Sequence, residues 1–365
     1  MTLISAITRF LAACLALSCL GSALYAQTDE SLPAEIVAHG QGSENDGEER
    51  ALTPEEQAAE LARQARVREL TAELGERQTA IEDLQSEVGI YHPSLIENYS
   101  DLAAVFLELE DFDNAANTLN EALQIARINN GLYSEQQLPL LDDLIASHLR
   151  RQDWQKVDDL VHLDHHISSR IYEKTDGQYL AAAEGYGQWK LRVLRENLLQ
   201  LSNNGLYDEA EELSDFYGRL LLNVEFSEAI EARDLISLLQ GKSQADMSLA
   251  QAIANTHYSY FQGAETRYIT QTRCRNITGS NGQLVRQCFN VQVENPRYRQ
   301  SQIDAKHIAV NRSLREINQV IERMESIRDN GDLSAAERQN LDSLIANLQT
   351  QADTVYRDSR RRSRF

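Results

Sequence analysis

The sequence is poor in positive charge and in long apolar segments. Lys and Arg number 35 against 56 Asp and Glu, which gives a formal net charge of −21. A nucleic-acid-binding protein needs basic surface to displace counterions from phosphates, so this balance argues against that class. Beyond residues 1–26, no stretch is apolar enough to span a bilayer. We therefore expect neither a nucleic-acid partner nor a transmembrane span.

The common catalytic motifs are missing too. The sequence contains no Gly-x-Ser-x-Gly, His-Glu-x-x-His or Gly-x-Gly-x-x-Gly. Gly241-Lys242-Ser243 is similar to the end of a phosphate-binding loop, but Ile236 stands where the loop needs its first glycine. The carboxylates are so numerous that no pair can be singled out as acid and base. We expect a non-enzyme without a cofactor, and an enzyme with a dispersed site is the less favoured alternative.

The N-terminus has the pattern of an export signal. Arg9 precedes the apolar run FLAACLALSCLG, and SALYA ends before Gln27. Residues 1–26 are therefore interpreted as a signal peptide cleaved after Ala26. A lipoprotein signal at Cys14 or Cys19 is the alternative, although Arg9 lies close to the first and the second lacks the usual leucine. The expected location is the periplasm of a Gram-negative bacterium, with secretion or lipidation at Cys19 as alternatives.

Only two cysteines remain after such a cleavage, Cys274 and Cys288. An oxidising compartment lets a disulfide between them persist. The segment 263–298 alternates at period two around Gly-Ser-Asn-Gly, which predicts a β-hairpin. Pairing Cys274 with Cys288 in this hairpin puts the apolar residues together on the opposite face, and the two observations support one register. Those residues are Ile269, Ile277, Val285, Phe289, Val291 and Val293.

The segment that follows the signal is acidic and almost free of large apolar residues. Residues 27–52 cannot bury enough surface to offset their ordering entropy, so we expect a disordered linker, with an acidic docking tail as the alternative. A helix is predicted to start at Thr53, where Glu56 completes a capping box, and to end near Gly89.

A repeat of 42 residues follows. Gly89-Ile90-Tyr91 recurs as Gly131-Leu132-Tyr133, and LELEDFDNA aligns with LRRQDWQKV at the same offset. A third, less regular copy, LRENLLQLSNNGLYDEAEEL, places Tyr207 and Ala210 at the positions of Phe112 and Ala115. A period near 40 residues is typical of stacked helix pairs, since one pair cannot bury its own apolar stripe. We predict a helical array over residues 53–262.

The repeat resembles tetratricopeptide repeats, in particular the 42-residue form of kinesin light chains. The resemblance covers roughly residues 75–240 and is carried by Tyr99, Leu102, Ala103, Phe106, Phe112, Ala115, Leu119 and Ala122. The second copy departs from the pattern at Leu141, Ile145 and Asp164, and the third has Asn197 where leucine is usual.

The resemblance implies a solenoid that binds a protein or peptide on the inner face formed by the first helix of each repeat. The implied partner-binding groove comprises Glu97, Ser100, Ala104, Asp142, Ala146, Arg150, Arg192, Arg195 and Leu199. Arg192 and Arg195 would clamp a peptide carboxylate.

The last third of the chain predicts an antiparallel helical hairpin or coiled coil over residues 299–357. Heptad positions carry Ile303, Val310, Leu314, Ile317, Ile321 and Met324, and Ser334 with Glu337 forms a second capping box. Self-association through these helices is an open alternative. The basic tail 358–365 contains Arg360, Arg361, Arg362 and Arg364. A frayed, solvated tail is the favoured interpretation, and binding of an anionic lipid, a polysaccharide or an acidic partner is the alternative.

One histidine-rich segment carries imidazoles at a spacing that suits a transition metal. His162, Asp164, His165 and His166 lie in the predicted second helix of repeat two, where solvated side chains are the simpler interpretation, so we expect no metal. Altogether the sequence predicts a mostly α, exported, non-catalytic scaffold or adaptor of the bacterial envelope. The alternative is an envelope protein that binds polysaccharide or lipid through its C-terminal region.

Overall fold

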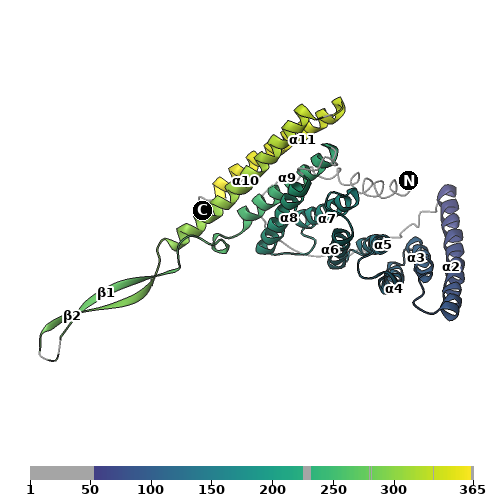
Figure 1. The fold of residues 1–365 in the computed structure, drawn as a ribbon, viewed down its shortest axis with the longest axis horizontal. Helices are drawn as coiled ribbons and strands as arrows, with labels where there is room; N and C mark the ends of the chain where they lie inside the picture. The colour runs from purple at the N-terminus through teal and green to yellow at the C-terminus, as the bar shows by residue number, and fades with distance from the viewer. Residues whose placement is uncertain (1–52, 225–231, 279, 281, 332, 363–365) are drawn as a thin grey trace, which may run out of the picture. The chain divides into compact units, whose positions relative to one another are not determined.

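The computed structural model describes residues 53–224, 232–278, 280, 282–331 and 333–362. The predicted signal peptide and acidic linker lie outside these residues. Residues from Ala58 onward form one compact unit, which contains nearly all the elements described below. Helices and strands carry the labels of Figure 1.

The helix before the repeats, α2, spans Pro54–Val88. It starts at the predicted capping box: the Thr53 backbone N–H donates to Glu56 Oε2 at 2.7 Å, and the Glu56 N–H donates to Thr53 Oγ1 at 3.3 Å. Gly89, with φ of 92°, lets the chain leave the helix.

The first two repeats are helix pairs whose backbones repeat at 42 residues. They consist of α3 (Leu95–Glu108) with α4 (Phe112–Asn130) and α5 (Gln137–Arg150) with α6 (Trp154–Ile171). The turns match residue by residue, because Glu110 and Gln152 both have positive φ, and Asp111 and Asp153 both stand at the N-cap position of the second helix. Of the two, Asp111 accepts a hydrogen bond from a backbone N–H of its helix. The predicted period is therefore confirmed.

The small residues named by the tetratricopeptide pattern lie where helices meet. Ala103, Ala115 and Ala122 are fully buried, and Leu119 fills the space between them. A methyl side chain lets two helix backbones approach closely, which is why the pattern has alanine there. Each helix pair packs against the next: α4 contacts α5, and α6 contacts α7 (Figure 1).

The third helix pair is α7 (Gly177–Glu196) with α8 (Asn203–Val224). Its first helix keeps the 42-residue spacing: Leu95, Gln137 and Tyr179 are all buried. The predicted register was wrong for this repeat, because it placed Asn197 and Leu199 within the first helix. In the structure Asn197 adopts a left-handed conformation and ends α7, and a longer connection leads to α8.

The remaining helices are α9 (Ala232–Asn255), the 3₁₀ turn Tyr258–Tyr260, α10 (Tyr298–Asn330) and α11 (Ala335–Arg362). α10 and α11 form the predicted helical hairpin, and both also pack on α9. Ile317 and Met324, at heptad positions, are fully buried in the core that these helices share with α7 and α8. The apolar stripe is thus covered within the chain. No helix among the described residues is long and apolar enough to cross a membrane.

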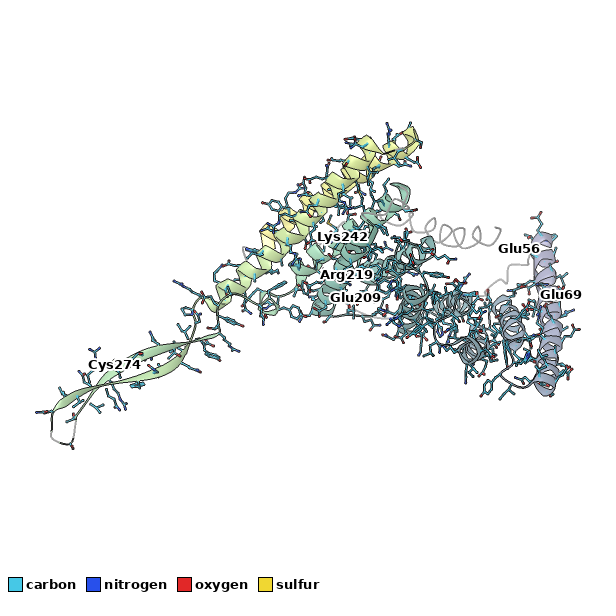
Figure 2. All side chains as sticks on the ribbon, viewed as in Figure 1. Glu56, Glu69, Glu209, Arg219, Lys242 and Cys274 are labelled. Carbon is cyan, nitrogen blue, oxygen red and sulfur yellow. A yellow bond between two sulfur atoms is a disulfide. The ribbon has the colours of Figure 1, made fainter. Side chains whose placement is uncertain are left out.

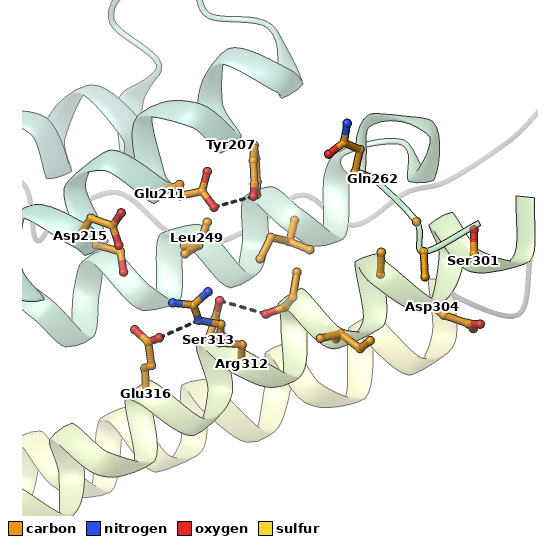
Figure 3. A pocket seen from close by; sticks show the side chains of 17 residues that line it. Tyr207, Glu211, Asp215, Leu249, Gln262, Ser301, Asp304, Arg312, Ser313 and Glu316 are labelled. Atoms are coloured by element: carbon orange, nitrogen blue, oxygen red, sulfur yellow. Dashed lines mark hydrogen bonds and ion pairs between the residues drawn. The ribbon is translucent and has the colours of Figure 1, made fainter. Parts of the chain in front are cut away.

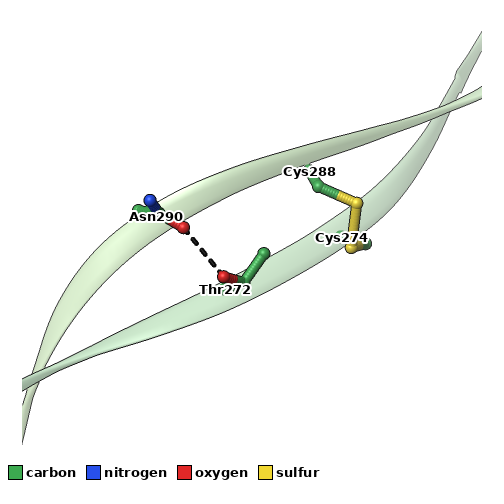
Figure 4. The surroundings of a disulfide bond; sticks show 4 residues. All are labelled: Thr272, Cys274, Cys288 and Asn290. Atoms are coloured by element: carbon green, nitrogen blue, oxygen red, sulfur yellow. Dashed lines mark hydrogen bonds between the residues drawn. A yellow bond between two sulfur atoms is a disulfide. The ribbon is translucent and has the colours of Figure 1, made fainter.

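The hairpin consists of β1 (Tyr268–Thr278) and β2 (Leu284–Glu294), and its register is the predicted one. Cys274 pairs with Cys288, and their sulfurs form a disulfide beside the Thr272–Asn290 hydrogen bond (Figure 4). A two-stranded hairpin is marginal in water, and a bridge that closes a loop of about 15 residues adds roughly 3 kcal/mol. The prediction of a mostly α fold with a disulfide-bonded hairpin is confirmed.

Candidate functional site

The first helices of the repeats present a row of equivalent positions, which we call the first-helix row. At 42-residue steps its members are Ser100 on α3, Asp142 on α5 and Glu184 on α7. Of the other predicted groove residues on α3 and α5, the structure exposes Glu97, Ala104, Ala146 and Arg150.

The third repeat requires a correction. Leu199 was assigned to the inner helix, but it lies beyond the end of α7 at Glu196. The residues of α7 at the corresponding steps are Ala181, Glu184 and Gln188. Arg192 does keep its predicted position, because it lies 42 residues after Arg150 of the preceding repeat.

The two arginines proposed to clamp a carboxylate share one acidic neighbour. Arg192 Nε donates to Glu196 Oε2 at 3.1 Å, and Arg195 lies 3.5 Å from Glu196 Oε1. The Arg192 guanidinium also lies 5.3 Å from the centroid of the Trp154 ring. Glu196 thus partly neutralises the pair.

Uncompensated acid gathers instead on the second repeat. Asp142 of α5, next to Asp143, faces Asp164 of α6, which replaces the small residue Ala122 of the first repeat. The surrounding protein raises the pKa of Asp142 to about 6, with a smaller contribution from Asp143. Burial, and then the charge of Asp142, raises the pKa of Asp164 to about 7. Among the described residues, none donates a hydrogen bond or provides a cation to either group.

These raised pKa values predict that Asp164→Asn stabilises the protein at neutral and alkaline pH. The folded state keeps the Asp164 proton up to about pH 7, whereas the unfolded chain loses it near pH 4, so stability falls as pH rises through this window. The variant avoids the loss, and we expect a gain of about 1–2 kcal/mol near pH 8 and almost none near pH 4. Urea unfolding of both proteins at the two pH values measures it.

Asp159→Asn is the matched control, since this residue is exposed on the same helix. It should change the free energy of unfolding by less than about 0.5 kcal/mol at either pH. Burial lowers the pKa of His165 to about 4, so its effect on the pH dependence of stability is opposite to that of Asp164. Comparing each variant with wild type at the same pH removes this effect. A gain for Asp164→Asn that is independent of pH would contradict the interpretation.

Helix α9 contacts the row at the third repeat. Ser237 of α9 donates a hydrogen bond to Glu184. Beside this contact, the Tyr217 ring of α8 lies against Gly187 and Gly241, at which any Cβ would come within 2.5 Å of ring or hydroxyl atoms. Gly241 is thus an interior helical residue where helices cross. On repeat three the row therefore meets α9 at Glu184, while Ala181 and Gln188 stay exposed.

Two buried lysines, Lys190 and Lys242, connect neighbouring helices, and Figure 2 labels Lys242. Lys190 of α7 bonds Asp158 of α6 at 2.9 Å and Glu209 of α8 at 2.8 Å. Lys242 of α9 bonds Asp246 at 2.5 Å and Glu316 of α10 at 2.8 Å. Each lysine is surrounded by two acids, so both networks hold their helices in one arrangement.

The histidines of α6 have different surroundings. His165 packs against Tyr179, Tyr186 and Phe216, and its Nε2 is buried without a partner. His162 lies 3.6 Å from Asp158, and His166 packs edge-on against another ring. Within the described part of the chain, no group of three or more His, Cys, Asp or Glu side chains is placed to hold a metal ion.

A cleft of about 690 Å³ lies between α8, α9 and α10 (Figure 3). Its walls carry Glu211, Asp215, Asp304 and Glu316, against which Arg312 is the one basic lining residue. Its floor and rim are apolar, with Leu249, Ile253, Ala305, Ala309 and an Ile308 side chain that is 64% exposed. We call this feature the acidic cleft.

Sequence reasoning found neither the acidic cleft nor the lysine networks. The repeat contained one signal for a lysine network. Phe106, His148 and Lys190 are equivalent positions 42 residues apart, and all three are buried. A lysine at a buried repeat position indicates an internal ion pair. The cleft has no such signal, since its residues come from three helices and a loop.

Comparison with known proteins gives only distant similarities. No family model matches the chain, and no curated protein matches it. Two structures of kinesin light chain TPR-like repeats from Podosopora anserina are similar at 12% identity. The first, a point variant, matches 53% of this chain and 84% of its own length with a TM-score of 0.38. The second matches 71% of this chain and 97% of its own length with a TM-score of 0.32.

A computationally designed self-assembling cyclic homooligomer is also similar, at 9% identity, 80% and 96% coverage and a TM-score of 0.26. The tetratricopeptide-like character of this chain is supported by its own 42-residue geometry.

Proposed function

We propose that this protein is a non-catalytic scaffold that holds a protein partner on the first-helix row of its first two repeats. The supporting observation is that Asp142 and Asp164 lie close together on α5 and α6, and that no cation pairs with either among the described residues. A partner segment that carries Lys or Arg would neutralise both carboxylates.

The energetic argument follows from the repeat itself. Asp164 replaces a fully buried alanine of the preceding repeat, and its charge costs stability at neutral pH. Groups that cost stability without an internal partner are characteristic of binding surfaces. Exposed Ala104 and Ala146 leave room for backbone to approach the same face. The partner is therefore expected to be a basic, extended or helical segment.

The bacterial envelope is the proposed compartment. The Cys274–Cys288 disulfide is consistent with an oxidising environment, and the N-terminal pattern indicates export. An adaptor role fits a helical array, because stacked repeats supply a long surface with little rearrangement.

Site-specific crosslinking tests the proposal. A photoreactive amino acid at Ala146 should capture one protein in native envelope, and mass spectrometry should place the crosslink within a segment rich in Lys or Arg. Asp142→Lys should reduce the capture at least about tenfold, since a repulsive charge replaces an attractive one. Asp159→Lys, on the neighbouring helix, should leave it unchanged. Equal capture by all three proteins, or a crosslinked segment without basic residues, would contradict the first-helix row as the site.

A further inference from the structure

The β1–β2 hairpin, here called the ribbon (residues 267–294), is a basic part of a very acidic chain. It contains four arginines and one glutamate, whereas the whole protein has a net charge of −21. The register puts Arg273 and Arg275 on the face opposite the disulfide, among the six apolar residues. The Arg275 guanidinium lies 5.6 Å from the centroid of the Phe289 ring.

This apolar and basic face has no partner among the described residues. Phe289 and Ile269 are each 40% exposed and Val285 is 50% exposed. The two strands pair with each other alone, so each also keeps an open edge. An exposed apolar face with open edges is a surface that proteins normally cover.

The two arginines on this face of the ribbon indicate which kind of surface would cover it. Stacking two ribbons face to face would bring Arg273 and Arg275 of both copies together, which is unfavourable. A complementary surface needs acids around an apolar floor. The acidic cleft has this composition: Asp215 and Asp304 are exposed at its walls, and Ile308 is exposed at its rim.

Hydrogen bonds at the base of the ribbon, here called its root, keep the ribbon outside the acidic cleft of the same chain. Asn295 fixes the root through its side chain, which donates to Glu265 at 3.1 Å and to the Thr266 carbonyl at 3.0 Å, and through its backbone N–H, which donates to the Arg267 carbonyl at 2.9 Å. Gln262, Gly263 and Ala264 line the cleft just before this root. The ribbon therefore starts beside the cleft without entering it.

We infer that the partner of the ribbon is a second copy of this chain, whose acidic cleft receives the apolar and basic face. Because root and cleft are adjacent in one chain, two copies related by a twofold axis would each insert a ribbon into the other. Such a reciprocal exchange closes on itself and gives a dimer rather than a filament. It joins complementary charges while it removes the ribbon's apolar face from water.

Sedimentation velocity over a concentration series tests the inference on the purified protein. Arg273→Glu/Arg275→Glu (the ribbon variant) and Asp215→Arg/Asp304→Arg (the cleft variant) alter exposed residues, so both should fold. Each should raise the dimer dissociation constant about 100-fold, because the substituted side chains would then meet like charges. An equimolar mixture of the two variants should dimerise again, since each ribbon then meets a cleft of opposite charge.

The control variant is Arg286→Glu, on the disulfide face of the ribbon, which should leave dimerisation unchanged. A monomeric wild-type protein at about 100 µM would overturn the inference. So would an equal effect of the control, or a mixture that stays monomeric. Co-sedimentation of a monomeric wild type with phosphatidylglycerol vesicles, lost in the ribbon variant, would assign the ribbon to an anionic lipid surface instead.

Discussion

Replacing Lys190 with methionine is expected to lower the free energy of unfolding by about 3–5 kcal/mol. Lys190 is 3% exposed, and its ammonium is the cation between Asp158 and Glu209. The Asp158 carboxylate also accepts the Trp189 indole N–H at 2.8 Å. Methionine fills a similar volume but leaves two acids without a counter-charge in a site with little water. That uncompensated charge is the source of the loss.

The measurement can use the protein's own fluorescence. The chain has two tryptophans, Trp154 and Trp189, and their rings lie 6.5 Å apart beside this network. Urea unfolding followed by their emission therefore reports on α6 and α7 directly. Arg195→Met is the control, because Arg195 is an exposed partner of Glu196 and its loss should cost less than about 1 kcal/mol. Comparable losses in the two variants would contradict a special role for Lys190.

Two glycines of α7 should respond to alanine in opposite directions. A Cβ at Gly187 would lie 2.1 Å from the Tyr217 hydroxyl oxygen, and the ring cannot retreat because Gly241 is on its other side. We expect Gly187→Ala to destabilise the protein by about 2–3 kcal/mol through overpacking. Gly185→Ala should stabilise it by about 0.5–1 kcal/mol, since no atom lies within 4 Å and alanine favours the helix.

Differential scanning calorimetry of the two variants distinguishes these effects. The residues are two positions apart on one helix, so helix propensity is nearly the same at both and the difference measures the Tyr217 contact. Tyr217→Leu combined with Gly187→Ala should recover part of the loss, because the shorter side chain frees the space. Equal and stabilising effects of both alanines would show that Tyr217 does not pack as described.

The features predicted correctly from sequence depend on short-range rules. The turn between the helices of a repeat needs positive φ at Glu110 and Gln152 followed by an aspartate cap, and these positions recur at one offset. The hairpin register was fixed by two independent constraints, a cysteine pair and an apolar face. Local patterns of this kind can be recognised in the sequence without knowing which helices pack together.

The features that were missed depend on how helices meet. Asn197 ends α7 in a left-handed conformation, which an asparagine can adopt but does not have to adopt. The helix end was therefore not evident from the sequence, and the alignment of Tyr207 with Phe112 suggested the wrong register for the first helix. The acids on the second repeat became visible only once Asp142 and Asp164 faced each other across α5 and α6. The acidic cleft needed α8, α9 and α10 in place before its charges formed one surface.

The division of the buried side chains into clusters has a consequence for cooperativity. From α2 to α6 they fall into separate small clusters, each shared by neighbouring helices. From α7 to α11 one large core continues to Val355, and a small cluster of Val157, Trp189 and Val193 joins α6 to α7. A linear array opens from its free end in steps, whereas a single core opens as a whole. We therefore expect the first two repeats to open at a lower free energy than the helices that support the ribbon.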